Sequence, residues 1–532
     1  MTSLRRSSQR TRRWCFRLLL LVAPLALLFV TAGPAFTHDE DELMGGTSIQ
    51  PRGPRPPGHG SSQHDMRLVG FDPLQGRSAY QPIIHQQGKR WIAYIGHHGG
   101  SAPNTLKRGA PVESNGTSIV DVTNPARPVY LFHIPGPAGA GEAGGAQMVR
   151  ACDGSTLPKG VPGKTYLLRE KGTQGHEVFD VTDPSNPVLV STPVDNLRDA
   201  HKSWWECDTG IAYLVSDGRP DGWRVSRMTK VFDLSDPANP VFLRNFGLVG
   251  QEPGSTGPAP INLHGPISLG PNGLPNGSGK NRIYFGYGTS SQGVLQIVDR
   301  DKLLNDSSLG PLVSDNPTST SPRVKPSPAQ LLFPQVGKLD LFPSAGAHTT
   351  FPVLRQPVPD FSDNTSGAVR DFVVITNEST ANECQENRQL VYIADVTTES
   401  KPFNVSNYQV PEAPQQFCQV GGRFGSHSSS ENFTPIYYRR IMFFAWFNAG
   451  VRAVDIRDPF NPVEIAFYIP ATTANTDVRC RDNNDPSTCK IAIQTNNVDV
   501  DDRGYVIIVD RANTGMHILE LVGDARKVAN FP

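Results

Sequence analysis

A short pattern that recurs along the chain constrains its fold more than any other feature. A run of apolar residues ends at an acidic residue, and a turn containing two prolines follows. Clear copies are GTSIVDVTNPARPV, GHEVFDVTDPSNPV, TKVFDLSDPANPV and GVRAVDIRDPFNPV, which begin at residues 116, 175, 229 and 450. Weaker copies place acidic residues at Asp299, Asp395 and Glu520. An apolar run closed by an Asx-Pro turn is typical of a β-strand followed by a chain reversal, in which we expect the acidic side chain to cap the turn.

Each copy lies within a larger unit of about four strands. In the third unit, strand-like runs at 201–208 and 210–217 precede the motif strand, and another at 240–246 follows it. Seven such units predict an all-β fold, a seven-bladed β-propeller with four-stranded blades. The 50 glycines and 47 prolines among 532 residues agree, because both residue types interrupt long helices.

The last unit has no fourth strand of its own before the chain ends at Pro532. An isolated strand-like run, MRLVGFDP at 66–73, lies before the first unit. We therefore predict one propeller domain over residues 66–532, with its ring closed by this N-terminal strand.

The first 35 residues have the order of an export signal. Six arginines and no acidic residue accompany an apolar run at 18–30, and small residues follow it. This run is shorter than the roughly 20 helical residues that cross a bilayer, so a cleaved signal peptide is favoured over an uncleaved anchor. The stretch 11–21 also approaches a twin-arginine signal. We expect a secreted or periplasmic protein with no membrane span in the mature chain. Residues 36–65 are expected to form a disordered linker.

Cysteine usage agrees with export. Six cysteines lie beyond the signal: Cys152, Cys207, Cys384, Cys418, Cys480 and Cys489. An even number without a CxxC motif indicates structural disulfides in an oxidising compartment. Sequence alone leaves 15 pairings open, and we favour the nearest-neighbour scheme of 152–207, 384–418 and 480–489.

The repeat motif resembles the LVIVD repeat of secreted bacterial propeller proteins. The resemblance covers nearly all of residues 83–523, and it implies the propeller fold without implying one reaction. Beyond residue 35 the chain carries six more acidic than basic residues and no basic stripe, so no nucleic-acid partner is expected. For an exported propeller of this kind we expect the partner to be an unknown small molecule or a component of the cell envelope.

Histidines recur where the blades begin. The opening segments contain His85, His201, His264, His348 and His427, with Gln147 and Asn496–Asn497 in the other two units. Because the first strand of every blade lines the central channel of a propeller, these side chains should converge at one end of the axis. The alternative is that each histidine only hydrogen-bonds backbone or water in the channel.

The loops after the second strands point to the same end of the channel. They contain His97–His98, Glu170 and Glu378. Imidazole is a common ligand of Cu, Zn and Fe, and nearby carboxylates orient such ligands. An adjacent histidine pair also makes the chain similar to the selenium-binding proteins and methanethiol oxidases, which implies a copper site at His97 and His98.

Two functions follow from the sequence. The first is a propeller metalloprotein that holds a Cu or Fe ion at the axis and acts as a metal-dependent oxidoreductase. Its ligands would come from His201, His264, His348, His427, His85, His97 and His98, with Glu170 and Glu378 orienting them. The second is a non-enzymatic binding scaffold at the cell envelope, with contacts from Trp204, Trp205, Trp446 and Tyr287. No GxSxG, HExxH or dinucleotide-binding motif suggests another chemistry.

Overall fold

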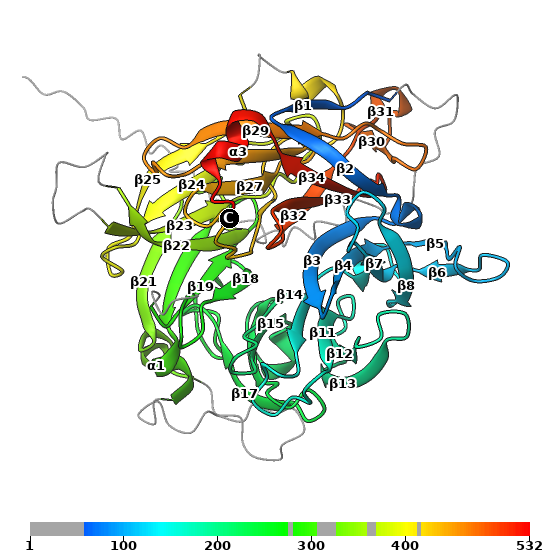
Figure 1. Cartoon of the computed structure of the whole chain (residues 1–532). Helices are drawn as coiled ribbons and strands as arrows, with labels where there is room; N and C mark the ends of the chain where they lie inside the picture. The colour runs from blue at the N-terminus through cyan, green and yellow to red at the C-terminus, as the bar shows by residue number, and fades with distance from the viewer. Residues whose placement is uncertain (1–57, 275–279, 306–325, 359–368, 412–415) are drawn as a thin grey trace, which may run out of the picture. The chain divides into compact units, whose positions relative to one another are not determined.

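The computed structural model describes residues 58–274, 280–305, 326–358, 369–411 and 416–532. It confirms a seven-bladed β-propeller of four-stranded antiparallel blades (Figure 1). In Figure 1 the chain passes from blade to blade around the ring, and its last strands, in red, return beside its first, in blue.

The first three blades each contain a plain four-stranded meander. Blade one has β3 (Ala79–Gln87), β4 (Arg90–Gly99), β7 (Gly116–Asp121) and β8 (Val129–Pro135). Blade two has β10 (Val149–Asp153), β11 (Thr165–Glu170), β12 (His176–Asp180) and β13 (Val188–Val194). Blade three has β14 (Ala200–Trp205), β15 (Ile211–Ser216), β16 (Met228–Asp233) and β17 (Val241–Phe246).

The other four blades continue the same order. Blade four has β18 (Leu263–Ser268), β19 (Arg282–Tyr287), β20 (Val294–Asp299) and β21 (Gln335–Asp340). Blade five has β22 (Thr349–Pro357), β23 (Val369–Thr376), β24 (Val391–Asp395) and β25 (Phe403–Tyr408). Blade six has β26 (Ser428–Ser429), β27 (Ile441–Ala445), β28 (Val451–Asp455) and β29 (Val463–Ile469), and blade seven has β32 (Thr495–Val500), β33 (Tyr505–Asp510) and β34 (Met516–Leu521).

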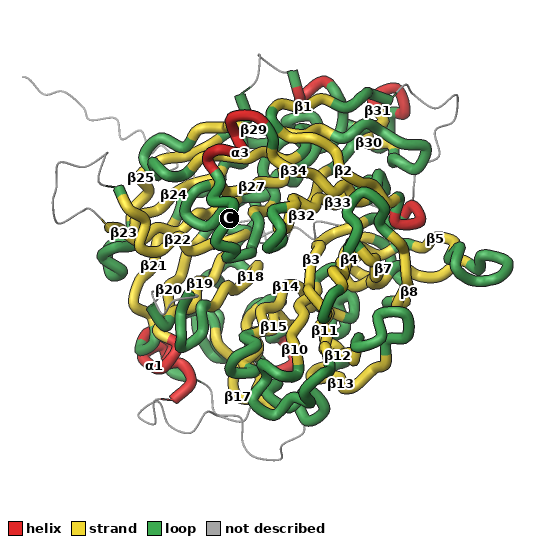
Figure 2. Tube along the Cα trace, in the orientation of Figure 1, coloured by secondary structure: helices red, strands yellow, loops and turns green. Residues whose placement is uncertain are grey.

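Short elements decorate this ring. Strand β9 (Gly141–Ala146) pairs with the end of β4, and two small hairpins are formed by β5 (Ser101–Pro103) with β6 (Val112–Ser114) and by β30 (Val478–Cys480) with β31 (Cys489–Ile491). The described helices are short, as Figure 2 shows: α1 (Arg300–Asn305), α2 (Pro328–Leu332) and α3 (Gly523–Val528). No helix among the described residues is long and apolar enough to cross a membrane.

Five of the seven repeated acidic residues cap turns, as predicted. Asp299 instead accepts from the backbone N–H of Lys302, and Glu520 forms an ion pair with Arg67. Asp121 Oδ1 accepts a hydrogen bond from the backbone N–H of Thr123, at 2.8 Å. The same bond to the residue two positions later recurs at Asp180, Asp233, Asp395 and Asp455. Each of these five carboxylates therefore satisfies a backbone donor where the third strand ends, and the chain reverses into the fourth strand.

An N-terminal strand closes the ring, also as predicted. Strand β2 (Met66–Asp72) pairs antiparallel with β34 and completes blade seven. A further strand, β1 (Ser62–His64), pairs with β29 on the outer edge of blade six. The linker predicted for residues 36–65 is therefore wrong at its end, because residues 62–64 satisfy their backbone groups in a sheet. The signal predicted for residues 1–35 and the rest of that linker, up to residue 57, lie outside the described residues.

All three disulfides of the nearest-neighbour scheme are present: Cys152–Cys207, Cys384–Cys418 and Cys480–Cys489. The first joins the inner strand of blade two to the loop after the inner strand of blade three. Disulfides of this kind persist in oxidising compartments, which is consistent with an extracellular or periplasmic protein.

Closure of the ring predicts unequal roles for two residues of β2. Met66 is 1% exposed and packs with residues of blades six and seven, whereas Leu68 is 43% exposed. We expect Met66→Ala to lower the free energy of unfolding by about 2–5 kcal/mol, because the truncation leaves a cavity. Leu68→Ala on the same strand should change it by less than about 0.5 kcal/mol. Guanidinium denaturation would measure both, and equal effects would contradict this account of closure.

Candidate metal centre

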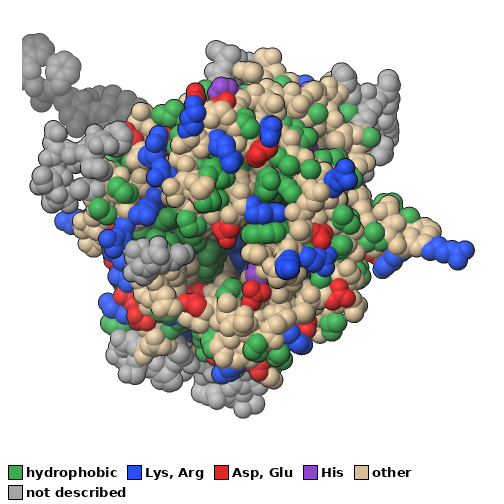
Figure 3. Space-filling model, viewed as in Figure 1, with side chains coloured by type: hydrophobic (Ala, Val, Ile, Leu, Met, Phe, Trp, Pro, Cys, Tyr) green, Lys and Arg blue, Asp and Glu red, His purple; other side chains and the backbone are tan. Residues whose placement is uncertain are grey.

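Four histidines from four consecutive blades meet at the propeller axis. His201 and His264 are the second residues of β14 and β18, while His348 and His427 immediately precede β22 and β26. Their rings follow one another at centroid separations of 4.6, 3.6 and 4.4 Å. All four side chains are buried. The face drawn in Figure 3 is hollowed near its centre. The structure thus brings together the four histidines predicted to converge from blades three to six.

The Nε2 atoms of these histidines point toward one another. The Nε2 atoms of His201 and His264 are 2.9 Å apart. One ligand atom each from His264, His348 and Glu378 lie within 4.8 Å of one another. The Nε2 of His427 is 3.5 Å from Oε1 of Glu378, and no described residue hydrogen-bonds this nitrogen. Among the described residues, His264, His348 and Glu378 therefore form the compact group of possible ligands, while His201 contacts His264 and His427 contacts Glu378 at its edge.

The opposite ring nitrogens are held by the protein. Nδ1 of His264 donates to the backbone carbonyl of His348 at 2.9 Å, and Nδ1 of His427 donates to the carbonyl of Asn496 at 2.6 Å. A carbonyl can only accept, so each Nδ1 carries the proton and each Nε2 presents a lone pair. This is the arrangement that histidine ligands of metals usually show.

Two carboxylates lie near His201, without a hydrogen bond to its Nδ1. Its Nδ1 lies 3.5 Å from Oε2 of Glu142 and 3.8 Å from Oε2 of Glu170. Glu170 is fixed in turn by the backbone N–H of Gln147, which donates to its Oε1 at 2.7 Å. Glu170 thus lies beside His201, and its role in orienting that ring stays a prediction. The fourth histidine, His348, has its Nδ1 3.1 Å from the hydroxyl of Thr349.

Burial keeps these imidazoles neutral. It lowers the pKa of His201, His264, His348 and His427 well below the usual range, and nearby cations such as Arg227, Lys202 and Arg511 add to the effect. Neutral imidazole is the form that binds metals, so the site needs no loss of a proton from these rings at neutral pH.

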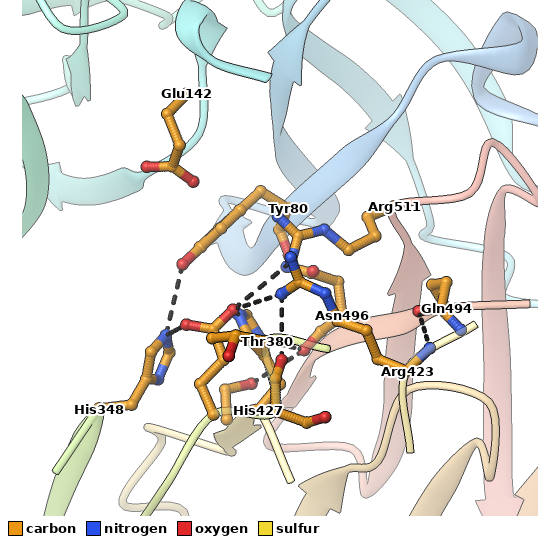
Figure 4. Close-up of polar contacts among 12 residues, drawn as sticks. Tyr80, Glu142, His348, Thr380, Arg423, His427, Gln494, Asn496 and Arg511 are labelled. Carbon is orange, nitrogen blue, oxygen red and sulfur yellow. Dashed lines mark hydrogen bonds and ion pairs between the residues drawn. The ribbon is translucent and has the colours of Figure 1, made fainter. Parts of the chain in front are cut away.

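Glu378 contacts His348, Arg423 and Arg511, three residues labelled in Figure 4. Its Oε2 lies 3.6 Å from Nε2 of His348. Its Oε1 lies 3.0 Å from Nη1 of Arg423 and 3.5 Å from Nη1 of Arg511. We expected Glu378 to orient a ligand, but its position among the Nε2 atoms makes it a candidate ligand itself, with the two arginines offsetting its charge.

The adjacent pair His97–His98 does not act as a unit. Consecutive residues of a strand point to opposite faces, and both lie in β4. His97 faces away from the axis and contacts the hydroxyl of Ser118 through Nε2 at 2.7 Å. His98 faces the axis, but its Nε2 accepts a hydrogen bond from Nη2 of Arg511 at 2.6 Å. Neither therefore offers a lone pair to the four-histidine cluster.

His85 also lies outside the cluster. It is the seventh residue of β3, and its Nε2 contacts Oδ1 of Asp153 at 2.9 Å. The residue of β3 that matches His201 in β14 is Tyr80, the second in its strand. His85 lies away from the cluster because β3 begins at Ala79, six residues before it, whereas β14 begins one residue before His201.

Sequence reasoning missed two residues at the axis, Tyr80 and Glu142. The hydroxyl of Tyr80 lies 3.3 Å from Nε2 of His201 and 3.5 Å from Nε2 of His348. A signal for Tyr80 was present, because an alanine precedes it as one precedes His201 and His348. Glu142 lies in β9, which has no counterpart in the other blades, so the repeat gave no signal for it.

The donor set fits a transition-metal ion. Metal–nitrogen bonds of about 2.0–2.1 Å place neighbouring ligand nitrogens about 2.9–3.4 Å apart, and the Nε2 atoms of His201 and His264 are 2.9 Å apart. Imidazole nitrogen with carboxylate oxygen suits Cu, Fe, Zn or Ni better than Ca or Mg. No protein-family model matches the chain, and no curated protein matches it, so the site must be interpreted from its own geometry.

The aromatic residues suggested as surface contacts do not form a docking surface. Trp205, Trp446 and Tyr287 are buried. Trp204 is half-buried, lies under the guanidinium of Arg150 and contacts the ring of Phe433. These side chains pack within and between blades.

A buried histidine away from the axis predicts how stability depends on pH. Burial lowers the pKa of His176 to about 4, while its Nε2 donates to the carbonyl of Val215 at 3.0 Å. Below its unfolded-state pKa of about 6.5, only the unfolded chain takes up this proton, so the free energy of unfolding falls as the pH falls toward 4. We expect His176→Gln to remove about 3 kcal/mol of that fall, because glutamine does not titrate.

Urea denaturation of the metal-free protein at several pH values between 4 and 7.5 would measure the difference. The exposed His64→Gln serves as a control for loss of a histidine. An unchanged pH dependence in the His176→Gln variant would contradict the prediction.

Proposed function

We propose that the protein is an exported LVIVD-type propeller that binds one Cu or Fe ion at its axis and acts as a metal-dependent oxidoreductase. The observation that carries the proposal is the orientation of the four axial histidines. For His264 and His427, a backbone carbonyl holds Nδ1 and leaves the Nε2 lone pair facing the axis. Two carboxylates approach Nδ1 of His201 from the other side.

Burying a polar atom without a partner lowers the stability of the fold, so such an atom in a folded protein suggests a functional role. The Nε2 of His427 has no hydrogen-bond partner among the described residues, so it loses the hydrogen bond that water gave it in the unfolded chain. The rings of His264 and His348 lie 3.6 Å apart, and every axial ring is buried. A cation bound between the Nε2 atoms would satisfy the lone pair of His427 and would replace the contacts that the Nε2 atoms of His201 and His264 make with each other.

The residues present suit a redox metal. His201, His264, His348 and His427 are the proposed nitrogen ligands, with Glu378 as a carboxylate ligand. When bound, Cu or Fe supplies one-electron chemistry that no protein side chain here provides. Glu142 and Glu170 orient His201, while Arg423 and Arg511 neutralise Glu378. Burial of the rings keeps bulk water from the site, and their neutral state lets them bind without competing protons.

Elemental analysis tests the proposal directly. The full chain, stripped of metal and then exposed to Cu or Fe and desalted, should retain about one ion. The double variant His264→Ala/His348→Ala should lose it, with an affinity at least about 100-fold weaker, because two ligands are removed.

The matched control is His176→Ala, which removes an equally buried histidine from β12. Its metal content should equal that of the wild type, and circular dichroism would verify that all variants are folded. Absence of metal from the folded wild type, or its retention in the double variant, would contradict the proposal. Either result would favour the binding scaffold instead.

A further inference from the structure

We infer that the phenolic oxygen of Tyr80 is an additional ligand of the axial metal, which makes the site a mixed imidazole, carboxylate and phenolate centre. The inference rests on the proposed metal-binding function and goes beyond it, because it specifies Fe(III) and Cu(II), the oxidised ions, as those that the site binds most tightly. Tyr80 touches the histidine cluster from a blade that contributes no histidine to it.

The repeat places Tyr80 where other blades place a ligand. It is the second residue of the inner strand β3, as His201 is of β14 and His264 is of β18. The side chain is 2% exposed. Equivalent positions on the inner strands of a propeller face the same level of the axis, so an oxygen donor replaces a nitrogen donor in blade one.

Contacts on several sides hold the phenol in place. Its hydroxyl lies 3.3 Å from Nε2 of His201 and 3.5 Å from Nε2 of His348, as Figure 4 shows for the latter. The ring meets those of His98, His201 and His427 edge-on, at centroid separations of 4.8, 5.6 and 5.4 Å. The oxygen thus lies within 3.5 Å of two proposed ligand atoms, one from blade three and one from blade five.

The chemistry of the donors explains the choice of ion. Four neutral imidazoles carry no charge, and the charge of Glu378 is shared with Arg423 and Arg511. A phenolate supplies a second hard anionic oxygen, which favours Fe(III) or Cu(II) over Cu(I). Coordination exchanges the O–H bond of Tyr80 for an oxygen–metal bond and releases the proton to solvent.

Visible absorption distinguishes a phenolate ligand from imidazole and carboxylate ligands. A phenolate bound to Fe(III) or Cu(II) gives an intense charge-transfer band in the visible region, and resonance Raman excitation in that band enhances tyrosine ring modes. We would load the metal-free full chain with ferric citrate or with cupric chloride. Absorption, Raman spectra and metal content would be recorded for the wild type, Tyr80→Phe and Tyr94→Phe.

Tyr94 provides a matched control, because it is a buried tyrosine of the adjacent strand β4 in the same blade. We expect the band in the wild type and in Tyr94→Phe, and its loss from Tyr80→Phe. Loss of the band alone supports the inference, as does loss of both band and metal from a folded Tyr80→Phe while Tyr94→Phe is unchanged.

Two results would overturn the inference. A wild type that binds metal without a phenolate band, or a Tyr80→Phe variant that retains the band, contradicts the role of Tyr80 and leaves the proposed function intact. A wild type that binds no metal contradicts the proposed function, and the inference with it.

Discussion

The pairing of β2 with β34 is the interaction on which the rest of the structure depends. It joins the start of the propeller to its end in one blade, which fixes blade one against blade seven. The axial cluster draws on both sides of this closure. Tyr80 comes from blade one, Arg511 follows the second strand of blade seven, and the carbonyl of Asn496 in blade seven accepts the Nδ1 proton of His427. An open ring would separate these groups.

Closure also explains how single histidines become a cluster. Each blade brings the same backbone position to the axis. One residue per blade is therefore enough to surround the axis with nitrogen and oxygen atoms that can bind a metal. Buried polar groups of this kind are expensive unless they are paired. The chain pairs most of them through carbonyls, carboxylates and arginines, whereas the Nε2 of His427 has no hydrogen-bond partner among the described residues.

Much of this could be predicted from the sequence, because the repeat carries it. The Asx-Pro turns identify the third strand of each strong unit. The number of blades follows from the number of units in which an acidic residue ends that strand, as Asp121 does in the first unit. The converging histidines followed from the same alignment. The disulfide pairs followed from the proximity of cysteines along the chain.

The errors lie where the repeat breaks. Residue type alone aligns His85 with the axial histidines, although β3 begins at Ala79 and places Tyr80 at the axis. The sequence presents His97 and His98 as one pair, although β-strand geometry turns adjacent side chains apart. Glu142 comes from β9, an insertion without equivalents, and its approach to His201 depends on a long-range contact that no local pattern encodes.

The central claim is that one metal ion sits among the Nε2 atoms of the axial histidines. Anomalous diffraction from crystals loaded with Cu or Fe, collected at the absorption edge of that metal, tests it most directly. The account predicts one dominant peak at the axis, within bonding distance of Nε2 of His264 and His348 and of a carboxylate oxygen of Glu378. Peaks confined to other histidines, such as His85 or His176, or an axis without any peak, would contradict it.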